Sequence, residues 1–275
     1  NRGTQRRQIA NVSGLGSAYL RDDWLSRVVD ALYSLSFKRI DHIFFENATD
    51  HAKFTRRGWV RTSQSEVIPG LGVDLHRFSQ SPWPSAANDE TRFLMIARLI
   101  GDKGVREYVE AASLVRRKHP GARFALLGDS AADNPTGITK DELAHWVAEG
   151  HIVHHEHTDD VRPYIAQAHC LVLPSYREGM SRTLLEGGAM GRPLIASDVP
   201  GCREAIDVGV NGLICRPRSA TSLADQITRF LSMSILQQQA MGAASHRKIS
   251  DEFNECEVIQ RYLEVLSFIE TIGTT

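Results

Sequence analysis

Two glutamates lie eight positions apart in the stretch REGMSRTLLE, residues 177–186. The residues from Arg182 onward favour a helix, so Glu178 precedes that helix and Glu186 lies more than one turn inside it. At that separation the two carboxylates cannot act as a close acid pair. Each can instead accept hydrogen bonds from two adjacent hydroxyl groups, which suits a ligand with two diol-bearing rings joined by phosphates. A glutamate at an arbitrary position is more often a solvated surface residue, so further signals are needed.

The residues between the two glutamates favour an anion site. CLVLP, residues 170–174, predicts a buried strand, and SYREGM predicts the loop that follows it. Ser181 is a suitable N-cap for the helix that begins near Arg182. We therefore expect free backbone N–H groups from Ser181 to Leu184 at a helix N-terminus, where the helix dipole also favours phosphate oxygens.

A basic loop supports the same ligand. ARLIGDKG, residues 97–104, follows another predicted strand and carries Arg98 and Lys103. Because the carboxyl ends of parallel strands share one edge of a sheet, this loop is expected near the glutamates. Two cations there can hold a diphosphate and stabilise its charge as it leaves, each contact contributing roughly 1.5 to 3 kcal/mol. A basic loop alone is usually a solvated turn, but together with the two glutamates it indicates a nucleotide-sugar site.

The elements that must position these residues alternate between strands and helices. The predicted strands are 92–97, 123–128, 151–155, 170–174, 193–197 and 211–215. The predicted helices between and after them are 105–118, 139–150, 159–168, 182–190, 201–209, 222–233 and 253–270. Alternation of this kind predicts an α/β fold with a doubly wound parallel sheet and right-handed crossovers.

The first part of the chain shows fewer elements. Its predicted helices are 27–40 and 48–58, and its clear strands lie in 41–47 and 65–70. Two strands are too few for a complete sheet, so we expect residues 1–80 to be the C-terminal part of a domain whose front portion is missing. The Ser-, Pro- and Asn-rich stretch 79–89 is the expected linker. Residues 81–255 then form a second domain, and residues 256–275 a final helix.

Composition excludes several classes of protein. Hydrophobic residues make up 42% and charged residues 24%, as in ordinary soluble domains, and 32 basic residues nearly balance 33 acidic ones, which disfavours nucleic acid as a partner. The apolar runs are shorter than the ~20 residues that cross a bilayer. Four widely spaced cysteines without a CxxC pair indicate reduced thiols in a cytosolic protein: Cys170, Cys202, Cys215 and Cys256.

Other motifs carry less weight. HIVHHEH, residues 151–157, contains four histidines, but a strand would place His154 on the face opposite the other three, and a single strand does not close a zinc site. This stretch is better suited to lie beside a nucleotide base. GLGSAY and GLGVDL do not complete GxGxxG, and no GxSxG is present, which disfavours a dehydrogenase and a hydrolase. Three arginines near the start could contact anionic lipid headgroups, although such charges are more often solvated: Arg2, Arg6 and Arg7.

Three segments together resemble the donor domain of retaining glycosyltransferases of family 4, which have the GT-B fold. These segments are 97–104, 171–206 and 210–227, and the similarity runs over about residues 67–232. Glu178 and Glu186 occupy both positions of the family's E-x7-E element. The segment REGMSRTLLEGGAMGRPLIASDVPGCRE is most similar to the branch that builds bacterial capsule, O-antigen lipopolysaccharide and lipid-linked oligosaccharides, including undecaprenyl-linked N-acetylgalactosaminyltransferases.

The resemblance implies roles for individual residues. Glu178 would contact the donor sugar and stabilise an oxocarbenium-like transition state, Glu186 would hold the ribose hydroxyls, and Arg98 and Lys103 the diphosphate. Catalysis would then rest on three of these residues: Glu178, Arg98 and Lys103. The sugar and phosphates would also meet the segment between the glutamates, at Gly179, Met180, Ser181, Thr183 and Leu184. On the acceptor side the matching positions are Ser13, where many relatives carry histidine, Gly14 and Gly16.

The resemblance further implies that residues 1–80 belong to an acceptor domain, that residues 81–255 form the donor-binding domain, and that the helix of 256–275 packs back on the N-terminal domain. It also implies a reaction. It is transfer of a sugar, with retention, from a nucleotide diphosphate sugar of the UDP type to a lipid-linked or polysaccharide acceptor, without a metal or other cofactor. The enzyme would be cytoplasmic and work in peripheral contact with the inner face of the membrane. Two alternatives stay open: a non-catalytic fragment that binds nucleotide sugars, and a GT-B-fold sugar-nucleotide epimerase.

Overall fold

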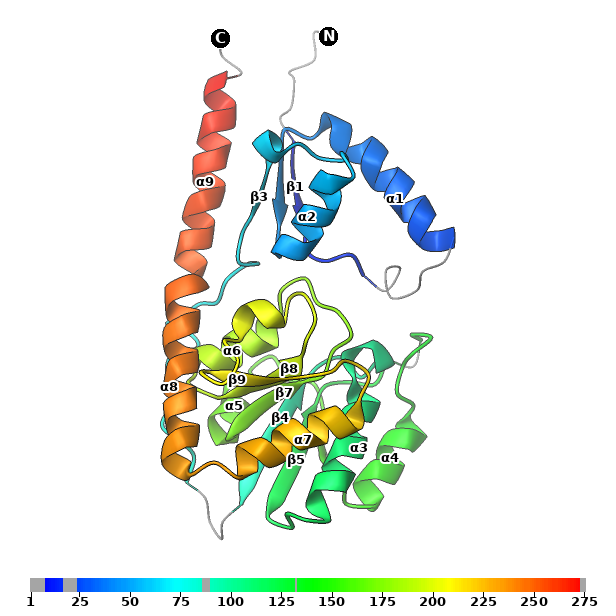
Figure 1. Ribbon diagram of the computed structural model, residues 1–275, viewed down its shortest axis with the longest axis vertical. Coiled ribbons are helices and arrows are strands. Elements are labelled where there is room, and N and C mark those ends of the chain that lie inside the picture. The colour runs from blue at the N-terminus through cyan, green and yellow to red at the C-terminus, as the bar shows by residue number, and fades with distance from the viewer. Residues whose placement is uncertain (1–7, 17–23, 86–89, 132, 273–275) are drawn as a thin grey trace.

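Two parallel β-sheets lie one above the other in the molecule, and each carries helices on its faces (Figure 1). The computed structural model describes residues 8–16, 24–85, 90–131 and 133–272. Arg2, Arg6 and Arg7, which the sequence suggested as lipid contacts, lie outside these residues. No helix within the described ranges is long and apolar enough to cross a bilayer.

The larger sheet has six parallel strands in the order β6-β5-β4-β7-β8-β9. These are β4 (Thr91–Ile96), β5 (Ala122–Leu127), β6 (Val153–His155), β7 (Cys170–Leu173), β8 (Leu194–Ser197) and β9 (Gly212–Cys215). Every residue of β7 and β8 is buried, as expected for strands covered on both faces. All six predicted strands of this sheet are therefore confirmed.

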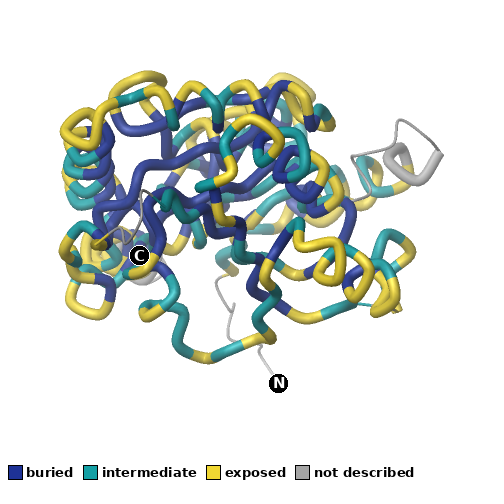
Figure 2. The backbone as a smooth tube through the Cα atoms, turned by 90° about the horizontal axis from the view of Figure 1, so that it is seen from below, coloured by how far each residue is buried: buried dark blue, intermediate teal, exposed yellow. Residues whose placement is uncertain are grey.

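Helices cover both faces of the six-stranded sheet. They are α3 (Val105–Arg116), α4 (Lys140–Ala148), α5 (Arg162–Gln167), α6 (Arg182–Ala189), α7 (Ala220–Leu231) and α8 (Ile235–Glu252). Helix α3 packs beside α7, and α6 packs beside α8. The backbone is buried mainly along the strands and exposed at the outer helix faces and loops (Figure 2).

The smaller sheet has three parallel strands in the order β1-β2-β3. They are β1 (Ile9–Val12), β2 (His42–Phe45) and β3 (Ser65–Val67), accompanied by α1 (Trp24–Ser36), α2 (Ala48–Arg56) and the 3-10 helices η2 (Phe37–Arg39) and η3 (Thr62–Gln64). Strand β1 was not predicted, because IANV is only four residues long and only Val12 among them is buried. Its pairing with β2, from Ile9 with His42 to Val12 with Phe45, defines it as a strand.

Side chains of β2 alternate between two apolar clusters. Ile43 and Phe45 pack with Phe54 of α2 on one face of the sheet, whereas Phe44 packs on the other face with Val258 and Val265. Both of the latter belong to α9 (Glu255–Ile272). The last helix therefore covers the face of the small sheet that α2 leaves open (Figure 1).

One expected helix is largely absent, and one observed helix was not expected. The stretch 201–209 forms only the short 3-10 helix η5 (Arg203–Ala205), because the Asn211 side chain accepts from the backbone N–H of Asp207 and donates to the carbonyl of Ala205. These bonds satisfy groups that a continuing helix would use. Helix α8 was not predicted, although it is one of the two longest in the described chain. The four cysteines are unpaired, as expected.

Arg192 anchors the segment that connects the two sheets. Its side chain is fully buried, and it donates from Nε to the carbonyl of Ile165 (3.1 Å) and from Nη2 to the carbonyl of Pro82 (2.7 Å) and to the hydroxyl of Ser81. The 81–82 segment is thereby fixed against α5, at the amino end of the sheet and away from the loops of interest.

Replacing Arg192 with leucine should lower the free energy of unfolding by roughly 2 to 4 kcal/mol, because several buried carbonyls would lose their donor. Urea unfolding of the two proteins measures this difference. Arg229→Leu, at an exposed position of α7, is the control and should change stability by less than about 0.5 kcal/mol. An equal effect of both substitutions would contradict the anchoring role.

Candidate functional site

The strand order reverses between β4 and β7. From β4 the sheet continues to β5 and β6 on one side, and from β7 to β8 and β9 on the other. Helices therefore leave adjacent strands toward opposite faces, which opens a crevice beyond their carboxyl ends. The 98–104 loop follows β4, and the 174–181 loop follows β7. The two sequence stretches with candidate chemistry thus meet at this point.

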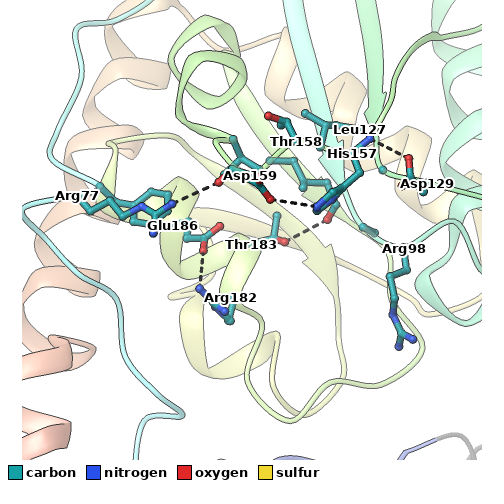
Figure 3. Close-up of a pocket in the computed structure, with 15 residues that line it drawn as sticks. Arg77, Arg98, Leu127, Asp129, His157, Thr158, Asp159, Arg182, Thr183 and Glu186 are labelled. Carbon is teal, nitrogen blue, oxygen red and sulfur yellow. Dashed lines mark hydrogen bonds and ion pairs between the residues drawn. The ribbon is translucent and has the colours of Figure 1, made fainter.

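A cavity of about 850 Å³ lies at this edge of the sheet (Figure 3). It is lined by Arg77, Phe78, Ile96, Ala97, Arg98, Leu127, Gly128, Asp129, His157, Thr158, Asp159, Val161, Arg182, Thr183 and Glu186. Its size is in the range of small-molecule sites. Three residues predicted from the sequence therefore share one cavity: Arg98, Thr183 and Glu186.

Charged groups occupy both ends of the cavity. Figure 3 shows Glu186 beside Arg77 and Arg182, and Arg98 at the other end with its guanidinium pointing away from Glu186. Burial raises the pKa of Glu186, and the nearby charges of Arg182 and Arg77 lower it in part. The Arg182 contact is long, at 3.4 Å from Nη2 to Oε1. Glu186 is thus a largely buried carboxylate that is weakly paired and directed at the cavity.

Lys103 and Glu178 form an ion pair with each other. Lys103 Nζ lies 2.6 and 2.8 Å from the two carboxylate oxygens of Glu178, and the Glu178 side chain is only 10% exposed. Neither residue lines the cavity that contains Arg98. The expected pairing of Lys103 with Arg98 around one anion is therefore not the arrangement in this structure.

The start of α6 agrees with the sequence in part. Ser181 is the N-cap, as predicted, and its hydroxyl accepts from the N–H of Leu184 (3.4 Å). The N–H of Ser181 itself donates to the carbonyl of Gly201 (3.0 Å). The expectation of free N–H groups from Ser181 to Leu184 was therefore too broad. Among the described contacts, only the N–H groups of Arg182 and Thr183 remain open to a ligand.

Thr183 connects the helix to the first strand of the larger sheet. Its hydroxyl donates to the carbonyl of Ile96 (3.1 Å), the last residue of β4. This bond holds the first turn of α6 beside Ile96, which lies two positions before Arg98. The two open N–H groups and Arg98 are thereby placed on the same crevice.

The 174–181 loop is held on two sides within the larger sheet. The N–H of Tyr176 donates to the carbonyl of Asp102 (2.9 Å), in the 3-10 helix η4 (Gly101–Lys103), and the N–H of Glu178 donates to the carbonyl of Pro200 (3.2 Å). Gly201 must be glycine, since its φ is 80° and a Cβ there would lie 2.6 Å from Glu178 Cβ. Loops after β4, β7 and β8 therefore form one packed unit.

The predicted acceptor-side residues lie on the loop after β1. Gly14 has a φ of 108°, and a Cβ there would lie 3.0 Å from the Cα of Gly179. A Cβ on Gly179 would lie 2.2 Å from the carbonyl oxygen of Ser13. Ser13 and Gly14 thus touch the 174–181 loop directly, whereas Gly16 has nothing described within 4 Å of its Cβ position. Met180, on the same loop, contacts Gly70.

Several residues of the cavity were not predicted. Arg77 donates to the carbonyl of Asp159 (3.3 Å), and the N–H of His157 donates to Asp129 (2.9 Å). The sequence placed the histidine stretch beside a ligand, but nothing in it distinguished Arg77 from other surface arginines. His154 bonds instead to the carbonyl of Gly128. Among the described residues, no three His, Cys, Asp or Glu side chains gather as a metal site.

Comparison with known proteins identifies the family. Residues 90–233 match the family described as Glycosyl transferases group 1. An N,N'-diacetylbacillosaminyl-diphospho-undecaprenol alpha-1,3-N-acetylgalactosaminyltransferase of Campylobacter jejuni is 29% identical in an alignment 272 positions long, which covers 94% of this chain and 69% of the relative. A glycogen synthase of Mycobacterium tuberculosis is 29% identical over 82% of this chain, which spans only 54% of that protein.

Solved structures show the same fold. Anabaena HepE in complex with UDP and glucose superposes with a TM-score of 0.79 at 18% identity, covering 95% of this chain and 72% of that one. The matched segment 90–233 covers just over half of the 275 residues and contains both the Arg98 loop and the two glutamates. The chain therefore belongs to the glycosyl transferases group 1 family and has the GT-B fold, as its motifs predicted.

Proposed function

We propose that the protein transfers a sugar from a UDP-type nucleotide sugar to a lipid-linked or polysaccharide acceptor, with retention of anomeric configuration. One observation carries this proposal: Arg98, Thr183 and Glu186 line a single cavity at the reversal of the strand order. Solved structures of the same fold contain UDP, and the relative from Campylobacter is named for an undecaprenol-linked substrate. Both support a nucleotide donor and an acceptor of this kind.

The donor fits the cavity in one direction. Glu186, at one end, would accept hydrogen bonds from the two ribose hydroxyls, with the base toward His157. The diphosphate would then run past the open N–H groups of Arg182 and Thr183 toward Arg98 at the other end. The sugar would lie beyond it, beside Gly179, Glu178 and Lys103. In this pose Lys103 exchanges its contact with Glu178 for one with the diphosphate.

The chemistry follows from these positions. The bond between the anomeric carbon and the phosphate oxygen breaks, and a bond to the acceptor oxygen forms on the same face. The departing phosphate oxygen takes the acceptor proton, so no separate base is required. Arg98 and Lys103 stabilise the negative charge that grows on the leaving group, and Glu178 stabilises the positive charge on the sugar. The proposed reaction uses no metal.

The two sheets would bind different substrates. The larger sheet, with residues 81–255, would bind the donor, while the smaller sheet, with residues 1–80 and the helix of 256–275, would present the acceptor. Because a lipid-linked acceptor lies in a bilayer, the proposed place of work is the cytoplasmic face of the membrane.

Binding and transfer should be measured separately on this chain. Calorimetry with UDP, GDP and ADP tests the donor site, and a transfer assay with a lipid-linked acceptor tests the reaction. We expect UDP to bind more tightly than the other two. Binding without transfer would support a nucleotide-sugar-binding fragment, and release of an epimer without acceptor would support an epimerase. Absence of any nucleotide binding would contradict the proposal as a whole.

Lys103→Ala should reduce the turnover number roughly 10²-fold or more, because one preorganised charge opposite the leaving diphosphate is lost. Steady-state kinetics with a UDP-sugar measures this. Lys118→Ala is the matched control, since Lys118 is an exposed lysine that follows α3 at the opposite edge of the sheet. Thermal unfolding of the Lys103 variant must accompany the assay, because Glu178 loses its partner. Near-normal turnover would rule out the role of Lys103.

Affinity for a UDP-sugar should depend on the ionisation of Glu186. Burial raises the pKa of this carboxyl, so it takes up a proton at a pH above the ordinary glutamate value of about 4.3. As pH falls through that raised pKa, a charged acceptor of the ribose hydroxyls is lost, and affinity should fall roughly fivefold.

Calorimetry with UDP-glucose across a pH series measures this dependence, since its diphosphate does not titrate there. Glu186→Gln should bind with the lower affinity throughout and lose the pH dependence. A wild-type affinity that stays constant down to pH 4 would show that Glu186 does not contact the ligand as a carboxylate.

A further inference from the structure

A short segment of the smaller sheet contacts the 174–181 loop of the larger one. This 46–50 segment follows β2, includes the first turn of α2 and contains Glu46, Asn47 and Asp50. Asn47 Nδ2 donates to the carbonyl of Gly179 (3.2 Å), and Arg177 forms an ion pair with Asp50. Three polar side chains therefore follow one strand end and face one loop.

These contacts are buried. The Asp50 side chain is 1% exposed and that of Arg177 is 20% exposed, while Glu46 and Asn47 are also buried. A buried carboxylate is stable only when its charge is compensated. Asp50 obtains this from Arg177 and from Asn47 Nδ2 at 3.0 Å. The ion pair is therefore a buried part of the contact between the two sheets.

Glu46 completes the contact. Its carboxylate accepts hydrogen bonds from Asn11 and from the backbone of Met180, while burial raises its pKa. A Cβ added to Gly179 would lie 2.6 Å from Glu46 Oε2. The segment therefore contacts Arg177 and Gly179, which flank Glu178, and also Met180, the next residue along the chain.

Glu178 itself makes no contact with this segment among those described. Its position is set indirectly, because the residues before and after it are both held from the smaller sheet. Its own N–H is held by Pro200 on the opposite side. The backbone around Glu178 thus has two restraints, one from each sheet.

We propose that Asn47 and Asp50 are positioning residues for Glu178. The Asp50–Arg177 ion pair holds the Glu178 carboxylate in place only while the two sheets are in contact. This inference rests on the proposed function. It adds that the smaller sheet does more than present an acceptor. It also completes the donor site, so a donor bound to the larger sheet alone would meet an incompletely ordered 174–181 loop.

The ion pair can be tested without substrate. Arg177→Met removes the cation without touching the N-cap of α2, which Asn47 and Asp50 form together. Asp50→Asn removes the charge from the other partner. Amide hydrogen exchange of residues 177–184 should become about tenfold faster in each variant. The double variant should show no further increase, since both substitutions remove the same interaction.

Arg203→Met is the matched control. Arg203 forms an ion pair with Asp198 on the loop after β8, at the same edge of the larger sheet, but both side chains are about half exposed. Amide hydrogen exchange of residues 177–184 in Arg203→Met should equal that of the wild type. Unchanged exchange in both Arg177→Met and Asp50→Asn would overturn the proposal.

Kinetics distinguishes positioning from simple stabilisation. If Glu178 is misplaced, kcat for transfer should fall roughly tenfold or more, while KM for the UDP-sugar changes little, because Arg98 and Glu186 lie outside the loosened segment. Arg177→Lys, which keeps the charge, should recover part of kcat. An increase in KM with unchanged kcat would overturn the positioning role. Absence of any transfer by the wild-type chain would instead count against the proposed function. The exchange measurements would still show whether the Asp50–Arg177 ion pair orders residues 177–184.

Discussion

The reversal of the strand order between β4 and β7 is the constraint on which the site depends. Arg98 and Glu178 are eighty positions apart in the sequence, and they belong to loops that leave adjacent parallel strands. Winding in opposite directions from these two strands removes any helix from above the crevice between them. Glycines at 104 and 201 then let the loops approach closely, since a Cβ at Gly104 would lie 2.1 Å from the carbonyl oxygen of Pro174. The fold creates the crevice, and the loops supply its chemistry.

Charges at this edge are already compensated in the free protein. Lys103 is paired with Glu178, and Arg177 with Asp50. Unpaired charges would be costly at these buried positions. In the proposed reaction a diphosphate would compete with Glu178 for Lys103, and it carries more charge than one carboxylate. Glu186 differs, because its partner Arg182 is distant and largely exposed. Burial raises the pKa of Glu186, and its weak pairing with the nearby arginines lowers that pKa only in part.

The sequence predicted what depends on local pattern. Apolar runs gave all six strands of the larger sheet, and Ser181 gave the start of α6, because burial and capping leave signals within a few residues. Helix α8 was missed for a related reason. Its buried positions include Gln238, Gly242 and Ser245, so the face toward the sheet has little hydrophobic periodicity. Gly242 is needed for contact, since a Cβ there would lie 2.3 Å from the carbonyl oxygen of Gly191.

The site residues that sequence reasoning missed depend on distant partners. Strand β1 exists through pairing with β2, thirty-three positions away, and Asp50 meets Arg177 across 127 positions. Neither contact has a local signature. The partner of Lys103 was likewise not predictable. The sequence around this lysine does not indicate that its ammonium group forms an ion pair with the carboxylate of Glu178. Spacing indicated which residues gather at the edge, but not how they pair.

The contact between Gly14 and Gly179 bears on the choice between transfer and hydrolysis. A Cβ on Gly14 would lie 3.0 Å from the Cα of Gly179, and a Cβ on Gly179 would lie 2.2 Å from the carbonyl oxygen of Ser13. In the proposed reaction this backbone contact lies directly beside Glu178, so bulk water is excluded from that side of the sugar. An acceptor hydroxyl brought in by the smaller sheet would then face less competition from water. The same contact that orders the 174–181 loop would favour a bound acceptor over solvent.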